Sequence, residues 1–177
     1  MKLREKNLKI LKNNHVYSEE MEHDACGVGV IVSTEGKKSR TIVEYGIEAL
    51  KAVWHRGAVD ADGKTGDGAG IHLEIPKDFF IEKIEVTGHE HDNSEICVGM
   101  IFLPRNDYSA QETCKTIVES ELTKNNFSIY GWRQVPVNPK ILGHKAFQTM
   151  PEIIQVLFKS NDQDLLEKDL ERKIYET

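Results

Sequence analysis

Short apolar runs, separated by polar and glycine-rich stretches, recur along the chain. Five of them have the length and the β-branched or alternating residues that predict β-strands; they cover residues 27–32, 71–76, 96–104, 127–137 and 151–160. The first run, GVGVIV, is typical of a strand that is buried on both faces or closely approached by other backbone. The second run alternates Ile71, Leu73 and Ile75 with polar residues, which predicts a half-buried strand.

Elsewhere, apolar residues recur every three or four positions and predict amphipathic helices; these segments are residues 40–57, 109–126 and 162–177. Gly57 can end the first helix. Ser109 stands three positions before Glu112, which predicts a capping box at the start of the second helix. Residues 77–86 fit either a helix or a strand. Five strands with three or four helices predict an α+β fold.

Length, charge and composition exclude several classes of protein. The 177 residues suit one domain with a core of ordinary size. A formal net charge of −6 offers no basic surface for phosphates, so we expect no nucleic-acid partner. No run approaches the roughly 18 apolar residues of a membrane span, so we expect no membrane contact. Residues 1–12 lack the apolar centre of a secretory signal, and we expect a cytoplasmic protein.

The chain has three cysteines with no CxxC spacing, which argues against a disulfide framework and against a zinc site. Cys97 lies in an apolar run, and Cys114 lies on the apolar side of a predicted helix. Both are therefore predicted to be small core residues. Cys26 differs from them because it opens a predicted strand and follows a polar segment of 25 residues.

Cys26 would be a weak nucleophile near neutral pH unless a base took its proton, because the pKa of a free thiol is about 8.5. Cleavage between Ala25 and Cys26 would place a new α-amino group, with a pKa of about 7.7–8.0, on the same residue as the thiol. Nucleophile and base would then form one unit. The alternative is a buried structural cysteine at the start of a strand.

Three further features do not predict a ligand site. The closely spaced carboxylates of residues 60–67 fail the EF-hand pattern because Ile71, rather than glutamate, occupies its twelfth position. The glycine-rich run at residues 66–70 lacks the lysine that follows in phosphate-binding loops. His89 and His91 lie in a polar loop, where histidines are usually solvated. We therefore expect no metal site.

Three pieces of sequence together resemble one known family: HDACGVG, HRGAVDADGKTGDGAGIHLEIPKDFF and GWRQVPV, in this order. They are similar to the N-terminal glutamine amidotransferase domain of the large subunit of glutamate synthase, a class II amidotransferase and N-terminal-nucleophile hydrolase. The resemblance implies an α/β/β/α sandwich, with residues 1–25 as a propeptide and residues 26–177 as the N-terminal part of the domain. Trp132 and Arg133, in the last piece, are expected to support the fold.

The resemblance also implies a reaction, in which Cys26 becomes the first residue after propeptide removal. Its thiolate would attack the side-chain amide carbon of glutamine, giving a γ-glutamyl thioester and ammonia, and water would release glutamate. Arg56 matches the arginine beside the family's nucleophile, where a guanidinium favours thiolate and negative charge; alternatively it is an exposed side chain at a helix end. Gly57 and Gly68 would shape the pocket loop, while Asp67 would orient neighbouring groups or cap a turn.

In the family, the ammonia passes to a synthase domain, which combines it with 2-oxoglutarate and reduces the product to glutamate. FMN and an iron–sulfur cluster serve that second reaction. The resemblance covers the amidotransferase segment alone, so we expect neither cofactor in this chain. The expected partners are L-glutamine and a synthase domain of the same polypeptide or complex.

The sequence departs from the family pattern at one point. The family's oxyanion pair, an asparagine and a glycine in an HNG-like motif, has no counterpart in this sequence. We therefore expect a fragment whose oxyanion donors lie beyond Thr177, with little or no activity alone, because losing one donor typically costs a factor of about 100–1000 in rate. The alternative is a non-catalytic remnant or an interaction module that keeps the fold.

Overall fold

The computed structural model describes residues 27–53, 59–162 and 165–177. The chain divides into two compact units. The first comprises Met1–Ala58 and Asp67–Ile71, and the second comprises Val59–Gly66 and His72–Thr177. Within the described residues, no helix combines the length and the apolar character that crossing a membrane requires.

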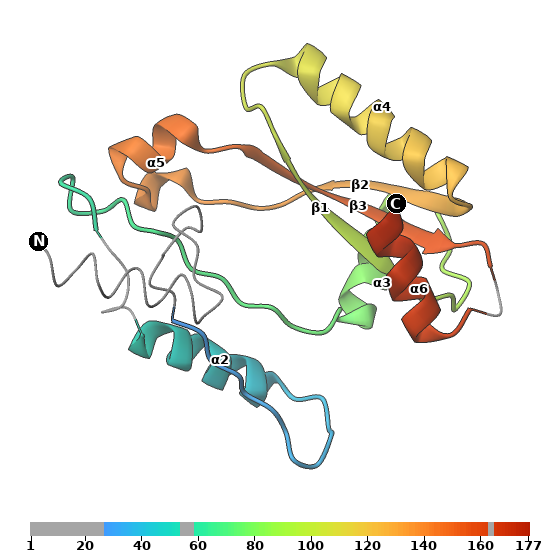
Figure 1. The fold of residues 1–177 in the computed structure, drawn as a ribbon, viewed down its shortest axis with the longest axis horizontal. Helices are drawn as coiled ribbons and strands as arrows, with labels where there is room; N and C mark the ends of the chain where they lie inside the picture. Colours follow the sequence, from blue (N-terminus) through green and yellow to red (C-terminus); the bar gives the residue numbers. More distant parts are fainter. Residues whose placement is uncertain (1–26, 54–58, 163–164) are drawn as a thin grey trace, which may run out of the picture. The chain divides into compact units, whose positions relative to one another are not determined.

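A three-stranded antiparallel sheet forms the centre of the second unit (Figure 1). Its strands are β1 (Cys97–Leu103), β2 (Phe127–Gln134) and β3 (Glu152–Ser160), in the order β1-β3-β2. β3 therefore pairs on both edges, and a β-bulge interrupts its register with β2 near Tyr130. These strands confirm three of the five predicted ones.

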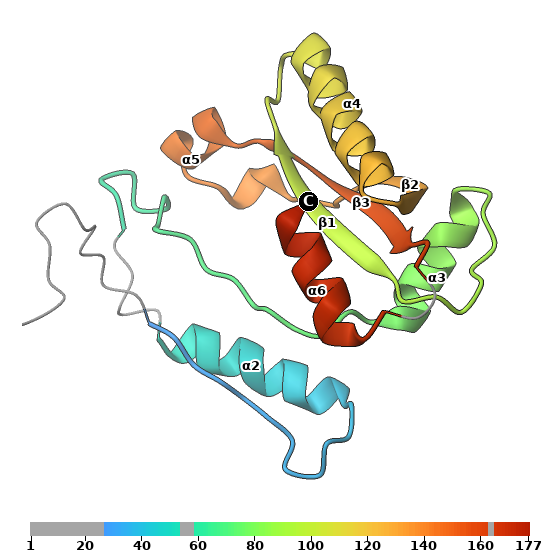
Figure 2. The same ribbon diagram turned by 45° about the vertical axis from the view of Figure 1, so that its right-hand side comes forward.

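Helices cover both faces of this sheet (Figure 2). On one face, α4 (Tyr108–Lys124) and α6 (Glu167–Glu176) pack against a core cluster of Cys97, Leu122, Phe127, Val156, Phe158 and Leu170. On the other face, α3 (Lys77–Val86) packs in a cluster of Phe80, Ile84, Ile96, Tyr130 and Leu157. Because successive side chains of a strand point to opposite faces, β3 contributes to both clusters. The predicted α+β class is confirmed.

The helix predicted at residues 109–126 is present as α4, and the one predicted at residues 162–177 is present as α6 but begins only at Glu167. The predicted capping box is wrong. α4 begins one residue before Ser109, and its N-cap is Asp107, whose carboxylate accepts a hydrogen bond from the amide of Ala110 at 2.9 Å. Ser109 is already inside the first turn, so its hydroxyl does not cap the helix. The ambiguous segment at residues 77–86 is helix α3.

Two predicted strands, at residues 27–32 and 71–76, are absent from the structure. Both segments run without strand pairing, and Val30 is 80% exposed. Within the described residues, no other segment forms a β-ladder with either of them, so their apolar side chains lack the neighbours that would bury them. The predicted burial of the first run on both faces is therefore wrong.

The first predicted helix is present and shorter than expected. α2 (Arg40–Ala52) begins after Ser39, whose hydroxyl accepts a hydrogen bond from the amide of Thr41 at 3.2 Å. It ends at Ala52, where the amide of Val53 still donates to the carbonyl of Ala49. The predicted end at Gly57 lies outside the described residues. α2 contains no fully buried residue, in contrast to α3 and α4.

Candidate functional site

The predicted site residues divide into two groups. Cys26, Arg56 and Gly57 lie outside the described residues, so their predicted roles stay predictions. Asp67 and Gly68 are described, and both are exposed. Gly68 has a φ of 92°, a backbone conformation that side-chain-bearing residues rarely adopt. This conformation accounts for a glycine at position 68.

Residues 59–66 lie between Gly57 and Asp67 in the sequence and form a closed loop, which we call the 59–66 hairpin. Val59 and Gly66 form an isolated antiparallel bridge at its base. Inside it, the amide of Asp60 donates to the carbonyl of Thr65 at 2.7 Å, and the amide of Gly63 donates to the carbonyl of Asp60 at 2.9 Å. The hairpin is therefore an ordered turn, although none of its residues is buried.

The carboxylate of Asp62 organises the interior of the 59–66 hairpin. It accepts hydrogen bonds from the hydroxyl of Thr65 at 2.6 Å and from the amides of Thr65 at 2.7 Å and Lys64 at 2.9 Å. The hydrogen bond from the Thr65 hydroxyl contributes most to holding the pKa of the Asp62 carboxyl well below its usual value, and the hydrogen bonds from the two backbone amides contribute less. The carboxylate that a cation loop would use as a ligand is therefore engaged by its own turn.

The hairpin lies against a helix that the sequence did not predict, α5 (His144–Thr149). Lys145 Nζ of α5 lies 2.6 Å from Asp60 Oδ2, and the amide of Ala146 donates to Thr65 Oγ1 at 3.4 Å. These contacts join positions more than 80 residues apart. α5 is short and follows the 3₁₀ turn η2 (Pro139–Ile141), so it lacks the repeated apolar spacing that reveals longer helices.

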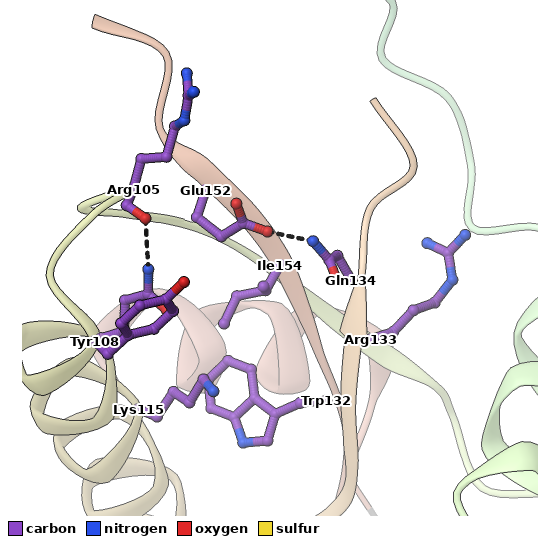
Figure 3. A pocket seen from close by; sticks show the side chains of 9 residues that line it. Arg105, Tyr108, Lys115, Trp132, Arg133, Gln134, Glu152 and Ile154 are labelled. Carbon is purple, nitrogen blue, oxygen red and sulfur yellow. Dashed lines mark hydrogen bonds between the residues drawn. The ribbon is translucent and has the colours of Figure 1, made fainter. Parts of the chain in front are cut away.

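A separate cavity of about 380 Å³ lies between α4 and the strands β2 and β3 (Figure 3). Its lining includes Tyr108, Lys115 and Trp132, together with Glu152 and Gln134, which are hydrogen-bonded to each other. The lining contains no cysteine, serine or histidine. The cavity therefore lacks the cysteine or serine nucleophile and the histidine base that acyl transfer commonly uses.

Trp132 and Arg133 have the structural roles that were predicted for them. The indole N–H of Trp132 donates to Glu119 Oε1 at 2.6 Å, and its ring packs against the core cluster under α4. Arg133 donates from Nη1 to Gln155 Oε1 at 2.6 Å. Both side chains thus connect β2 to its neighbours in the sheet and helix layer.

Of the two described cysteines, Cys97 is not a candidate for the nucleophile. Cys97 is buried, as predicted. This burial raises the pKa of its thiol from 9.0 to about 11, and the nearby charge of Glu95 contributes to a smaller extent. A thiol with so high a pKa is almost entirely protonated near neutral pH and is a poor nucleophile. Cys114 is half-buried on α4, so its predicted core position is only partly correct.

The described residues bring no three histidine, cysteine, aspartate or glutamate side chains together in a metal-binding group. His89 is exposed, as expected of a solvated loop histidine. His91 differs from the prediction, because it is half-buried and its Nε2 lies 3.0 Å from the carbonyl oxygen of Ser94. A carbonyl only accepts hydrogen bonds, so this ring nitrogen acts as a donor that fastens the loop.

The sequence of this chain matches one protein family over most of its length. Residues 26–177 match the family described as glutamine amidotransferases class-II. The matching region begins at Cys26, the residue singled out as a nucleophile. The chain therefore belongs to the class II glutamine amidotransferases.

Individual relatives confirm the resemblance to the amidotransferase domain of glutamate synthase. The chain is 51% identical to the glutamate synthase [NADPH] large chain of Azospirillum brasilense over 169 residues, which are 96% of this chain and 11% of that relative. It is 39% identical to the chloroplastic ferredoxin-dependent glutamate synthase 2 of Arabidopsis thaliana over 168 residues, 93% of this chain and 10% of that relative.

A third relative is the ferredoxin-dependent glutamate synthase 2 of Synechocystis sp., at 36% identity over 155 residues, 87% of this chain and 10% of that relative. The chain thus spans only about a tenth of the length of the curated relatives that it matches. The names of these three relatives differ in the electron donor, which is NADPH for one and ferredoxin for the other two.

Proposed function

We propose that this chain supplies the glutaminase half-reaction of a glutamate synthase and hydrolyses L-glutamine to glutamate and ammonia. The observation that carries the proposal is the family match over residues 26–177, which starts at Cys26. The similarity to glutamate synthases supports glutamine as the substrate. For the complete domain we propose the α/β/β/α sandwich of N-terminal-nucleophile hydrolases.

Cys26 is the proposed nucleophile. Its thiolate forms a bond to the side-chain amide carbon of glutamine, the carbon–nitrogen bond breaks, and the nitrogen leaves as ammonia. Water then attacks the γ-glutamyl thioester, the carbon–sulfur bond breaks, and glutamate is released with the thiol regenerated. Arg56 favours the thiolate and the negative charge of the transition state, while Gly57, Asp67 and Gly68 shape the pocket.

The base for this reaction is the α-amino group of Cys26, which becomes free when residues 1–25 are removed. With a pKa of about 7.7–8.0, a minor fraction of this amine is unprotonated near neutral pH, and this free form accepts the thiol proton and returns it to the leaving ammonia. Residues 1–25 carry five basic and five acidic side chains, so their removal leaves the formal net charge at −6. We propose that residues 1–25 act as a propeptide that keeps the base blocked.

We propose that the ammonia passes to a synthase domain of the same polypeptide or complex, where 2-oxoglutarate is reductively aminated. FMN and an iron–sulfur cluster would serve that reaction in other domains. The described residues offer no ligand set for such a cluster. We propose that the enzyme acts in the cytoplasm.

The proposal is tested by glutamine hydrolysis in the full-length protein, measured as glutamate release. Cys26→Ser should abolish the activity, because a serine hydroxyl is a far weaker nucleophile with this base. Cys114→Ser is the matched control, since Cys114 is half-buried on α4, and it should leave the rate near wild type. Absence of hydrolysis in the wild-type protein would instead favour a non-catalytic interaction module.

A further inference from the structure

The cavity between α4 and the strands β2 and β3 has the size of a site for a small molecule. Its volume is about 380 Å³. Ligand pockets usually have volumes of about 300–1,000 Å³, whereas packed interiors contain few voids larger than a water molecule. A hollow of this size between a helix and its sheet is therefore more than a packing defect.

Part of the cavity lining is apolar. Ile154 of β3 is buried, and Trp132 of β2 is half-buried, with its indole N–H already bound to Glu119 at 2.6 Å. The indole therefore offers the cavity an apolar ring instead of a hydrogen-bond donor. Tyr108, the first residue of α4, adds a second aromatic ring to the lining. These side chains favour a ligand that has an apolar group.

Two of the three cationic residues in the lining bind other parts of the protein. Arg105 donates from Nη1 to the carbonyl of Phe147 at 3.2 Å, and its guanidinium lies 4.4 Å from the centre of the Phe147 ring. The guanidinium of Arg133 lies 5.2 Å from the centre of the Phe79 ring. Figure 3 shows both guanidinium groups directed away from Lys115. Lys115 is therefore the cation that can meet a ligand in the cavity.

The ammonium group of Lys115 can exchange its present partner for a ligand. It pairs with Glu112 of the same helix at 2.8 Å, and the side chains of Lys115 and Glu112 are 28% and 72% exposed. A pair that includes so exposed a partner contributes little to stability. A ligand carboxylate in the cavity can therefore replace Glu112 at a small cost.

Glu152 supplies the opposite charge. It is half-buried at the first position of β3 and accepts a hydrogen bond from the side-chain amide of Gln134. A carboxylate has about four acceptor positions, so this bond leaves room for an ammonium group. In Figure 3, Glu152 and Lys115 lie apart, with Ile154 between them. The cavity thus presents a carboxylate, an ammonium group and an apolar surface together.

We propose that this cavity binds a free α-amino acid with an apolar side chain. Lys115 binds the carboxylate of the ligand, Glu152 binds its ammonium group, and its side chain packs on Trp132 and Ile154. A zwitterion brings a counter-charge to both protein groups, so neither charge is left uncompensated when the ligand displaces water. The site lies within the second unit and does not rest on the proposed glutaminase function.

L-leucine is the probe, and its binding to the full-length protein is measured by isothermal titration calorimetry. Two analogues each lack one charge, because isocaproate has no ammonium group and isopentylamine has no carboxylate. Each should bind at least about tenfold more weakly than L-leucine, since one charged protein group stays unpaired. Equal affinities for the three compounds would overturn the proposal, as would the absence of L-leucine binding at millimolar concentration.

Glu152→Gln tests the ammonium site, because glutamine keeps the hydrogen-bonding shape and removes the charge. The Kd for L-leucine should rise about tenfold. The Kd for isocaproate should not rise, since isocaproate has no group for Glu152 to bind, and its retained binding shows that the variant is folded. An unchanged Kd for L-leucine in Glu152→Gln would contradict the assigned role of Glu152.

Lys115→Gln tests the carboxylate site. The Kd for L-leucine should rise about tenfold, while the Kd for isopentylamine should not rise. Lys124→Gln is the matched control, because Lys124 also lies on α4 and pairs with the glutamate three positions earlier, Glu121, at 2.6 Å, but is not among the residues that line the cavity. It should bind L-leucine as the wild type does. Wild-type affinity in Lys115→Gln, or an equal loss in Lys124→Gln, would overturn the site.

Binding and hydrolysis are measured separately, so the two proposals can fail separately. If the protein hydrolyses glutamine but does not bind L-leucine, the amino-acid site is overturned and the glutaminase function stands. If L-leucine binds with the predicted dependence on Glu152 and Lys115 while no glutamine is hydrolysed, the amino-acid site stands and the glutaminase function fails.

Discussion

Strand β3 and the apolar run at residues 27–32 are both short and β-branched, yet they differ in exposure. Leu157 of β3 is completely buried, whereas Val30 is 80% exposed. β3 has a hydrogen-bonded strand on each edge and packed helices on both faces. Residues 27–32 have no such neighbours among the described residues. Apolar sequence thus becomes buried strand only where edges and faces are both covered.

The largest effect that distinguishes the two regions is expected from Leu157→Ala. This substitution should lower the free energy of unfolding by about 2–5 kcal/mol, because it leaves a cavity in the fully buried centre of the sheet. Met100→Ala is the matched control, since Met100 lies on edge strand β1 and is 48% exposed, and it should cost less. Equal losses in urea denaturation would show that the burial pattern of the sheet is wrong.

A smaller effect is expected from Gly99→Ala in β1. A Cβ atom at this position would lie 2.7 Å from Cγ1 of Val156, so the substitution overpacks the sheet and should cost about 1–3 kcal/mol. Val156→Ala in the same background should relieve the clash, so that the double variant loses less stability than the sum of the two single variants. Additive losses would contradict the contact.

A pH effect should follow from Cys97. The pKa of its thiol is raised from 9.0 to about 11 in the folded state, so the unfolded chain releases this proton first as pH rises. Stability is therefore fully present below pH 9 and falls above it, by about 1 kcal/mol between pH 9 and pH 10. Chemical denaturation at both pH values should show this decrease, and the decrease should be smaller in Cys97→Ala.

The smallest effect is expected from Val30→Ser in the exposed run. Because Val30 is 80% exposed, the substitution should change the free energy of unfolding by no more than about 0.5 kcal/mol. The measurement is urea denaturation under the conditions used for Leu157→Ala. A loss above about 1 kcal/mol would show that this run is buried, and the difference between the two regions would disappear.

The sequence allowed correct prediction of elements whose signal is local and repeated. The apolar spacing of residues 109–126 predicted α4, and three apolar runs predicted the strands of the sheet. The prediction misplaced the N-cap of α4 because Asp107 and Ser109 are both good capping residues, and the structure has Asp107 as the cap. The prediction of a strand at residues 27–32 was wrong because the spacing of apolar residues carries no information about a partner strand.

The candidate site was predictable only in part. The motifs around Cys26 and Arg56 identified the family, which the match over residues 26–177 confirms. The docking of the 59–66 hairpin was not predictable, because it joins Thr65 and Gly143 across almost 80 residues of sequence. A single glycine before a six-residue helix gives no local sign of that contact.

The most direct test is the N-terminal sequence of the full-length protein in a preparation that hydrolyses glutamine. We predict that the active chain begins at Cys26, with the amine and the thiol on the same residue. An active chain that still carries residues 1–25 would contradict it.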